Sequence, residues 1–373
     1  MEKHLHIVCL DVPYPVDYGG VFDLFYKIKT LSGLGIRIHL HCFEYGRGEQ
    51  PELSLYCMEV SYYQRKEGHK GFSHRYPYIV CSRSNLELLE RLSMDDYPIL
   101  LEGIHCTYLV NDQRFLDRKI FLRLHNIEHR YYRQLFYAEK TWIKKIYYWH
   151  ESRLLKKYEK EIANKAMIIV VSPKDADYYE REFSAKKIAL LPVFLPFSRV
   201  VSGAGKGCFC LYHGNLSVAE NESAAVWLLK KVFDNLSIPL VIAGKNPSPR
   251  LQKIALQHRF TCLVGNPTGE EMQDMISKAQ INILPSFNTT GIKLKLLNAL
   301  FNGRHCVVNK QTIEYTGLES LCHIGNDEKT CKEMIRNLFE LPFAGEEIAA
   351  REKILPSLYN NEKNGKQLIE WIW

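Results

Sequence analysis

The sequence predicts an α/β protein of two domains, each with a parallel sheet covered by helices on both faces. Short apolar, β-branched runs alternate with longer segments of helical period along the whole chain, which is typical of βαβ units. A length of 373 residues with 46% apolar content suits two domains with separate cores. Between the two series of predicted strands, residues 196–207 (PFSRVVSGAGKG) are rich in small residues and lack periodicity, so we interpret them as a linker.

Eleven short apolar runs are predicted as strands, each followed by a polar loop and a segment of helical period. In the first half they are residues 5–10, 37–43, 55–62, 99–102, 119–124 and 167–172. In the second half they are residues 208–213, 239–243, 261–264, 281–285 and 305–308.

The last segment, residues 346–373, is helical in period but contains Pro356, which predicts two helices or one kinked helix. Trp371 and Trp373 need a surface to pack on, and the first domain can supply it. The predicted organisation is a first domain at 1–195, a linker at 196–207, a second domain at 208–345, and carboxy-terminal helices at 346–373 that return to the first domain.

Composition excludes several classes of protein. No stretch approaches the roughly 18 apolar residues of a membrane span, and the start MEKHLHIVCL has no signal-peptide core. We therefore expect a cytoplasmic protein. The 11 cysteines form no CxxC pair, so buried free thiols are expected rather than zinc or disulfide chemistry.

The net charge of +7 is concentrated in the first 206 residues, which contain 31 basic and 25 acidic side chains. This surplus indicates an anionic partner, such as a phospholipid surface or a phosphorylated acceptor, although a solvated surface without a specific partner explains it equally well. Residues 140–166 contain eight Lys or Arg together with Trp and Tyr, which suits either a membrane interface or an amphipathic helix on the sheet. Nucleic-acid binding would rest on mild basicity alone, so we expect none.

Ligands of open parallel sheets bind beyond the carboxyl ends of the strands, so the loops that follow strands are the places to search. After the first strand comes DVPYPVDYGGVFDLF, in which Gly19 and Gly20 open a helix and allow close approach of a ligand to the backbone. A plain tight turn is an equal alternative.

The segment LHNIEHRYYRQL places His125, Asn126, Glu128 and His129 just after a predicted strand. This clustering indicates a functional site. Two other interpretations stay open: Asn126 caps the helix while His125 is a core residue, or His125 and His129 bind a metal, for which no third ligand is evident.

In the second half, Gly214 lies in the turn of LYHGNLSVAENESAAVWLL. Farther on, ILPSFNTTGIKLKLLNALFNGRHCVV presents Thr289, Thr290 and Gly291 at a helix start, with Lys293 in the first turn. Amide groups, hydroxyls and one cation together are typical of a phosphate cradle. A cation there is otherwise unfavourable by up to ~1 kcal/mol, which a bound anion would offset. A merely solvated Lys293 remains the alternative.

Two strings imitate nucleotide-binding loops. SGAGKG lacks the GxxxxGK[ST] spacing and has no strand directly before it. GLGIRIHL, residues 33–40, ends a helix and precedes a strand, so it is a helix C-cap.

Taken together, these stretches resemble the retaining nucleotide-sugar glycosyltransferases of the GT-B fold, specifically glycosyltransferase family 4, over nearly the whole chain. The matching motifs are the paired glycines, HNIE, VVSPKDADYY at 170–179, HGNLSVAEN, LVIAGKNP at 240–247, and GIKLKLLNALFNGRHCVV. The resemblance implies that the first domain takes the acceptor, that the second takes the nucleotide sugar at an interdomain cleft, and that the final helix crosses back.

The resemblance also implies site residues. His125 corresponds to the histidine beside the transferred sugar, and Tyr18, Asn126 and Glu128 would lie on the acceptor side. The residues implied around the donor are Gly19, Gly20, Gly214, Asn215, Thr289, Thr290, Gly291 and Lys293 for the diphosphate, Asn298 for the ribose, and Val264, Gly265 and Asn266 beside the base.

Three positions depart from the family pattern. Its usual Arg and Lys on the diphosphate correspond here to Asn215 and Glu220, and its ribose carboxylate corresponds to Asn298. The E-x7-E pair is absent, since Thr290 occupies its first position.

The implied activity is that of a hexosyltransferase that needs no metal or cofactor and uses a donor such as UDP- or GDP-hexose. Its acceptor would be a saccharide or a lipid-linked saccharide in glycan or polysaccharide synthesis, met at the inner face of the membrane. No carboxylate stands in an obvious nucleophile position, which favours front-face displacement with His125 positioning the sugar. Two other functions stay open: a catalytically degenerate relative that acts as a binding partner, and a sugar-nucleotide epimerase.

Overall fold

The computed structural model describes residues 2–16, 19–287, 291 and 293–373. The chain divides into two compact units, each built around its own parallel sheet. Unit 1 consists of residues 1–196 together with 359–373, and unit 2 consists of residues 197–358. Tyr18, Thr289 and Thr290, which the sequence places in the candidate site, lie outside the described residues.

Unit 1 contains a seven-stranded sheet in the order β3-β2-β1-β4-β5-β6-β7, and every neighbouring pair is parallel. The strands are β1 (His4–Cys9), β2 (Arg37–Glu44), β3 (Glu59–Gln64), β4 (Ile99–Glu102), β5 (Ile120–Leu124), β6 (Met167–Val170) and β7 (Ile188–Leu190). The central strands β4 and β5 are buried along their whole length, as expected for a sheet covered on both faces.

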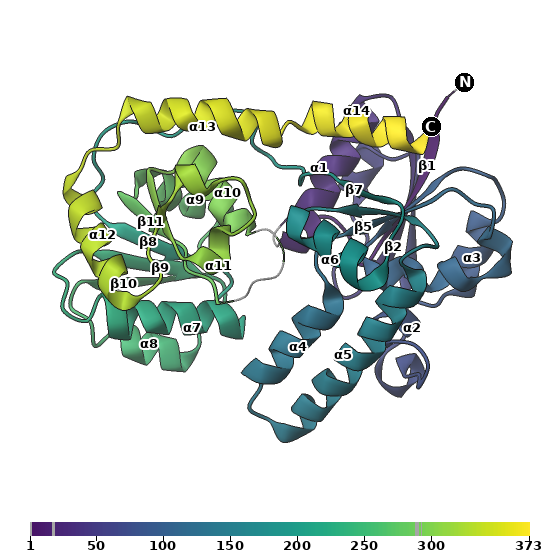
Figure 1. Cartoon of the computed structure of the whole chain (residues 1–373), viewed down its shortest axis with the longest axis horizontal. Coiled ribbons are helices and arrows are strands. Elements are labelled where there is room, and N and C mark those ends of the chain that lie inside the picture. Colours follow the sequence, from purple (N-terminus) through teal and green to yellow (C-terminus); the bar gives the residue numbers. More distant parts are fainter. Residues whose placement is uncertain (1, 17–18, 288–290, 292) are drawn as a thin grey trace. The chain divides into compact units, whose positions relative to one another are not determined.

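Helices cover both faces of this sheet. They are α1 (Gly19–Gly33), α2 (Tyr78–Cys81), α3 (Leu86–Leu92), α4 (Glu128–Ala138), α5 (Trp142–Ile162), α6 (Pro173–Phe183) and α14 (Asn361–Ile372). One apolar core includes side chains of α3, α5 and α6, and the other includes those of α1 and α14. Figure 1 shows α4 and α5 as an adjacent antiparallel pair joined by a short loop.

Unit 2 contains a six-stranded parallel sheet in the order β10-β9-β8-β11-β12-β13. The strands are β8 (Cys210–His213), β9 (Leu240–Gly244), β10 (Thr261–Gly265), β11 (Ile281–Ile283), β12 (His305–Val308) and β13 (His323–Ile324). The helices are α7 (Ala219–Trp227), which continues as a π-helical turn (Leu228–Val232), α8 (Pro249–Ala255), α9 (Gly269–Lys278), α10 (Leu294–Asn302), α11 (Lys310–Ile313), α12 (Glu328–Glu340) and α13 (Gly345–Leu358).

The predicted α/β class with two Rossmann-like domains is confirmed, and each of the eleven predicted strands overlaps one observed strand. Most boundaries differ by one or two residues, and the largest error is in the run 55–62, which starts at the last residue of a 3₁₀ turn, Pro51–Leu55, whereas β3 starts only at Glu59. Two edge strands, β7 and β13, are absent from the prediction, because three and two residues are too short to show a period.

The segment boundaries differ from the prediction at two places. Residues 197–207 belong to unit 2, where Val201 N–H donates to Phe301 C=O and Gly205 forms a bridge with Phe343. Of residues 346–373, only 359–373 belong to unit 1, because the buried guanidinium of Arg351 in α13 hydrogen-bonds the carbonyls of Gly303 and Arg304 in unit 2.

Three smaller predictions, for the carboxy-terminal helices, the end of α1 and the cysteines, are met in part. The segment 346–373 forms two helices, and the break falls after Leu358 rather than at Pro356, which lies inside α13. Helix α1 ends at Gly33 with Gly35 at φ +85°, as the predicted C-cap requires. All 11 cysteines are free thiols and seven are buried, whereas Cys208 and Cys262 are exposed.

Candidate active site

In unit 1, the carboxyl ends of β4 and β5 bring His125 against two buried carboxylates. His125 follows β5, and its Nε2 lies 3.3 Å from Oε2 of Glu102 and 3.8 Å from Oδ2 of Asp23. Glu102 is the last residue of β4, and Asp23 lies on α1. Because two carboxylates face the same ring nitrogen, His125 carries its proton on Nε2 and donates to Glu102. The imidazole is 22% exposed, so it remains accessible to a ligand.

Two buried cations neutralise this pair of carboxylates. The Lys27 ammonium lies 3.0 Å from Asp23 and 2.7 Å from Glu102, and the Arg123 guanidinium holds both oxygens of Asp23 at 3.1 and 3.2 Å. Burial alone would raise the pKa of Asp23, but Arg123, Lys27 and His125 together hold it well below its ordinary value. The pKa of Glu102 is lowered in the same way, with Lys27 as the strongest factor opposing burial.

This balance argues against a metal ion at Asp23, Glu102 and His125, although their ligand atoms lie within 4.8 Å of one another. A divalent cation would have to displace Lys27 or Arg123, each of which already neutralises a carboxylate. The arrangement instead fixes the orientation of His125.

The alternative in which His125 and His129 bind one metal ion does not fit the structure. His129 Nδ1 hydrogen-bonds Glu159, and its Nε2 lies 3.0 Å from the Tyr178 hydroxyl, so both nitrogens are engaged away from His125. Asn126 is not the helix cap either. The cap position of α4 is Ile127, and the Glu159 carboxylate of α5 accepts from the amides of Glu128 and His129 at 2.9 and 3.3 Å.

Glu128 is a buried carboxyl group whose side chain receives a hydrogen bond from Asn126. Burial and the nearby negative charge of Glu159 raise the pKa of Glu128 to about 8. Glu128 is therefore largely protonated at neutral pH, which the sequence pattern does not show.

Sequence reasoning missed His105, which follows β4 and approaches the same edge of the sheet. Its Nδ1 is buried and has no hydrogen-bond partner among the described residues, and burial with the neighbouring charge of Arg83 lowers the pKa of His105 well below its ordinary value. The rule that loops after strands carry the chemistry would have found it, since His105 comes three residues after Glu102.

In unit 2, the predicted site residues lie at or after the carboxyl ends of β8, β10 and β11, apart from Asn298, which lies on α10. Lys293 is the N-cap residue of α10, and Gly291 before it has φ +65°. Burial lowers the pKa of Lys293, and Glu220 near the start of α7 partly offsets that effect. The loop residue Ser286 donates to the Glu220 carboxylate at 2.5 Å.

Lys295 is a second cation at this edge that sequence reasoning missed. Its ammonium donates to Asn221 Oδ1 at 3.2 Å and lies 4.8 Å from the ring centre of Tyr212. Burial lowers the pKa of Lys295 to about 8, Glu220 opposes this, and Lys293 adds to it. The LKLLNAL helix pattern gives no sign that Lys295 points toward α7, because that depends on how α10 packs.

The loops after β8 and β10 are held by their own hydrogen bonds. Gly214 donates its N–H to Ala243 C=O at 3.1 Å, so this amide is not available to a phosphate. Oδ1 of Asn215 accepts from Ser217 N–H at 3.1 Å, which closes a local turn. Asn266 accepts from the backbone of Asn246 at 2.8 Å.

The other predicted donor residues lie as follows. Gly19 and Gly20 are the first two residues of α1 in unit 1. Asn298 is half-buried on α10, and its Oδ1 accepts from Asn302 at 2.8 Å. Val264 and Gly265 end the edge strand β10, directly before Asn266.

Comparison with known proteins gives matches to both sequence and fold. Residues 208–340 match the family model described as glycosyl transferases group 1. A protein of Klebsiella pneumoniae, described as an uncharacterized 44.6 kDa protein in the cps region, is 30% identical over 345 residues, which cover 86% of this chain and 87% of that protein.

Solved structures match the whole chain at low sequence identity. A glycosyltransferase from Rickettsia africae has a TM-score of 0.65 at 12% identity and covers 100% of this chain and 98% of its own. A variant of S. aureus TarM, solved with fondaparinux, α-GlcNAc-glycerol and UDP, has a TM-score of 0.69 at 11% identity, with 100% of both chains covered. These likenesses show a shared fold.

Proposed function

This chain belongs to the glycosyl transferases group 1 family and has the GT-B fold, and on this premise we propose that it transfers a hexose from a nucleoside diphosphate sugar, with retention of configuration. The relative from the cps region supports a saccharide or lipid-linked saccharide of polysaccharide synthesis as the acceptor. The UDP in the TarM structure supports a uridine nucleotide as the first donor to test.

The observation that carries this proposal is the pair of half-buried lysines at the carboxyl edge of unit 2. Lys293 and Lys295 both lie near the same carboxylate, Glu220, so two ammonium groups and one carboxylate meet at this edge. Expulsion of a nucleoside diphosphate places developing negative charge on the leaving group, which a fixed cation in a poorly solvated site stabilises.

Lys295 also replaces the cation that the sequence lacks. Family members usually have Arg and Lys where this chain has Asn215 and Glu220, and losing one such donor costs ~2.7–4 kcal/mol in well-studied enzymes. Here the Lys295 ammonium reaches from α10 to Asn221, the residue next to Glu220. We assign to it the charge that the first turn of α7 would otherwise supply.

His125 has a positioning role in this proposal. The hydrogen bond to Glu102 fixes the proton on Nε2, which leaves Nδ1 to accept a hydrogen bond from a sugar hydroxyl. Asp23 and Glu102 are buried and held by Lys27 and Arg123, so neither suits the role of a covalent nucleophile. This supports front-face displacement, in which the acceptor hydroxyl attacks from the side that the diphosphate leaves.

The donor test is calorimetry of the full chain with UDP-, GDP- and dTDP-hexoses. Wild type should bind one of them, and Lys295→Ala should weaken that binding at least tenfold. Lys278→Ala, which removes an exposed lysine of the same unit, is the matched control and should bind like wild type. Binding should weaken as the pH rises through about 8, because Lys295 loses its charge there.

Failure of every donor to bind would refute the proposal and favour a non-catalytic binding partner. For a donor that binds, an assay of nucleoside diphosphate release with product analysis separates transfer from epimerisation, since only transfer attaches the sugar to the acceptor. Activity that survives a chelator would support the metal-independent reaction that we propose.

The pair α4 and α5 supports membrane contact at the acceptor side. In the described residues, no helix is long and apolar enough to cross a bilayer. Trp142, Ile143 and Ile146 of α5 are each more than half exposed, and beside them is a basic groove of about 770 Å³. The groove is lined by six basic residues with aromatic neighbours: Arg130, Arg133, Arg153, Lys156, Lys157 and Lys160.

Exposed aromatic and aliphatic side chains beside clustered lysines suit an anionic membrane surface, where a lipid-linked acceptor would be met. Wild type should float with vesicles that contain phosphatidylglycerol at low salt. A variant with Arg153, Lys156 and Lys157 changed to Glu should stay in the soluble fraction, while Lys230→Glu with Lys231→Glu in unit 2 should float. Recovery of wild type wholly in the soluble fraction would remove membrane contact from the proposal.

A further inference from the structure

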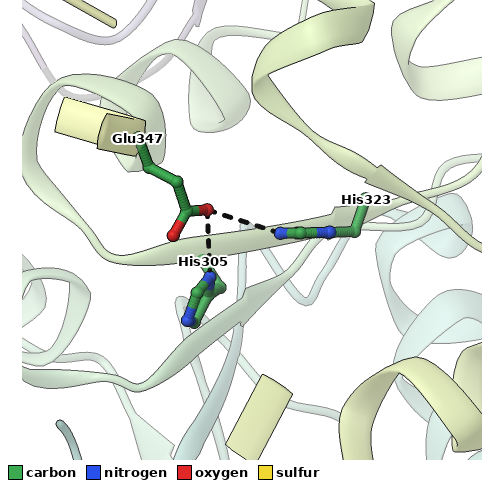
Figure 2. A group of neighbouring side chains, drawn as sticks. All are labelled: His305, His323 and Glu347. Atoms are coloured by element: carbon green, nitrogen blue, oxygen red, sulfur yellow. Dashed lines mark hydrogen bonds and ion pairs between the residues drawn. The ribbon is translucent and has the colours of Figure 1, made fainter. Parts of the chain in front are cut away.

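Two histidines and one glutamate of unit 2 converge at the amino ends of β12 and β13, opposite the carboxyl edge with the lysine pair. His305 is the first residue of β12, His323 is the first residue of β13, and Glu347 lies in the first turn of α13. Figure 2 shows the three side chains pointing toward one another, with dashed lines from one carboxylate oxygen of Glu347 to each imidazole ring.

The strand register explains this convergence. His323 pairs with Val307, which lies two residues after His305, so both imidazoles extend from the same face of the sheet. Their ring centres are 5.6 Å apart. Oε1 of Glu347 lies 3.2 Å from His305 Nδ1 and 3.5 Å from His323 Nε2, and one ligand atom from each residue lies within 4.8 Å of the others.

His305 is fully buried and has a hydrogen-bond acceptor at each ring nitrogen. Its Nε2 lies 3.1 Å from Leu341 C=O, and its Nδ1 faces the Glu347 carboxylate. A neutral imidazole has only one N–H. In the neutral form, the other ring nitrogen would therefore direct its lone pair at a lone pair of the oxygen that it faces. Either the ring carries two protons, or a cation occupies the space between Nδ1 and the carboxylate.

The second arrangement is that of metal-binding histidines, which donate the N–H of the other ring nitrogen to a backbone carbonyl and are thereby fixed in orientation. Four tetrahedral ligands at about 2.0–2.1 Å from Zn²⁺ are about 3.3 Å apart. The separations of 3.2 and 3.5 Å match that value. Two imidazoles and one carboxylate are ligands that zinc prefers.

The charges around Glu347 also differ from those of the His125 cluster. Asp23 and Glu102 each have a Lys or Arg in contact, whereas the only ion-pair partners recorded for Glu347 among the described residues are the two histidines. Arg351, one turn along α13, directs its guanidinium to the carbonyls of Leu300, Gly303 and Arg304 instead.

We propose that His305, His323 and Glu347 form a zinc site in which water completes the coordination. His323 is 36% exposed, which gives the ion and the water a route from solvent. The ion joins β12, β13 and α13, elements that come together only in the folded state, so its binding stabilises unit 2. This site is independent of the proposed transfer reaction, and its loss leaves donor binding at Lys293 and Lys295 in place.

The test uses the full chain without a polyhistidine tag, stripped with chelator and titrated with Zn²⁺ by calorimetry. Wild type should bind one ion, with Co²⁺ in its place giving the strong visible absorption of a four-coordinate site. His323→Ala and Glu347→Gln should each weaken zinc binding at least tenfold and abolish the Co²⁺ absorption. His258→Ala, a histidine of the same unit outside the cluster, is the control and should behave like wild type.

A second measurement separates the site from zinc held elsewhere by exposed thiols. Zinc should raise the Tm of wild type and of His258→Ala, but not that of His323→Ala or Glu347→Gln. Equal binding by wild type and His323→Ala would mean an adventitious ion only and would overturn the proposal. Absence of stoichiometric binding by wild type would overturn it as well.

Discussion

At the level of single residues, the buried carboxylates of unit 1 separate into two kinds according to their surroundings. Asp23 and Glu102 are buried against Lys27, Arg123 and His125 and stay ionised. Glu128 is buried beside another carboxylate and is held protonated. The first pair therefore serves to orient His125, and Glu128 serves as a neutral hydrogen-bonding group.

His125→Ala should reduce turnover at least tenfold while leaving the fold intact, because it removes the group proposed to position the sugar. Steady-state kinetics with a donor that binds, together with the Tm of the variant, measures both effects. His69→Ala changes an exposed histidine of the same unit and should leave turnover unchanged. Wild-type turnover in the His125 variant would exclude this residue from the site.

Glu128 should make stability depend on pH. In the folded protein the Glu128 carboxyl group keeps its proton up to about pH 8, whereas in the unfolded chain it loses the proton near pH 4.5. The folded state thus binds more protons between these values, so this group makes the free energy of unfolding fall as the pH rises from about 5 to 8.

Glu128→Gln should flatten that part of the profile, since glutamine does not titrate. Urea unfolding of wild type and Glu128→Gln at pH 5, 6.5 and 8 gives the difference in their free energies of unfolding, which measures the contribution of Glu128. The comparison is needed because burial also raises the pKa of Glu151 to about 7 and that of Asp175 to about 6. A difference that does not change with pH would show that Glu128 is ionised in the folded protein.

At the level of elements, α14 completes a face of unit 1 that the first 196 residues leave open. Leu368 and Ile372 of α14 are buried in the same core as Ile28 and Leu31 of α1. A Cβ on Gly365 would lie 2.8 Å from Leu34 and 2.9 Å from Thr30, so the two helices are in close contact.

Leu368→Ala should therefore destabilise unit 1 by about 2–5 kcal/mol, the usual cost of truncating a buried leucine. Hydrogen exchange should show faster exchange of the β1 and β2 amides, with the amides of unit 2 unchanged. Glu370→Ala, an exposed change on the same helix, should exchange like wild type. Equal exchange in both variants would mean that α14 adds no stability to unit 1.

Elements were predictable where an apolar run or a helical period marks them and a local signal ends them. Strands β4 and β12 match their predicted bounds, Ile99–Glu102 and His305–Val308, since continuous apolar runs are bounded by polar or glycine-containing segments. The two-residue strand β13 was not predictable, because its pairing with β12 is decided by tertiary packing.

Within the candidate site, sequence reasoning found residues that follow strands and missed those that reach the site from elsewhere. His125 follows a strand as predicted, and Lys293 is the N-cap residue of α10, one residue before the first turn in which it was predicted. Glu159 caps α4 from 31 residues away in sequence, and the direction of Lys295 depends on the packing of α10 against α7. Neither contact leaves a local pattern in the sequence.

At the level of the whole molecule, the two units differ in how the chain builds them. Unit 2 is one continuous segment, residues 197–358, whereas unit 1 needs residues from both ends. The six-stranded sheet of unit 2 and its apolar core lie within that segment.

A fragment of residues 197–358 should therefore fold alone and bind the nucleoside diphosphate of the proposed donor. Circular dichroism with cooperative thermal unfolding tests folding, and calorimetry with UDP and GDP tests binding. Lys295→Ala in the same fragment is the control for the site. A folded fragment that binds neither nucleotide, while the full chain binds one, would show that unit 1 contributes to diphosphate binding.

The split composition of unit 1 also bears on how the protein is synthesised. The ribosome finishes residue 196 and must add a further 177 residues before Trp373 emerges, which takes about 10–35 s at typical rates. Throughout that interval Ile28 and Leu31 of α1 lack the helix that buries them. A nascent chain that stalls before residue 359 would expose this apolar face to chaperones and proteases, so a message cut before that codon should yield little intact protein.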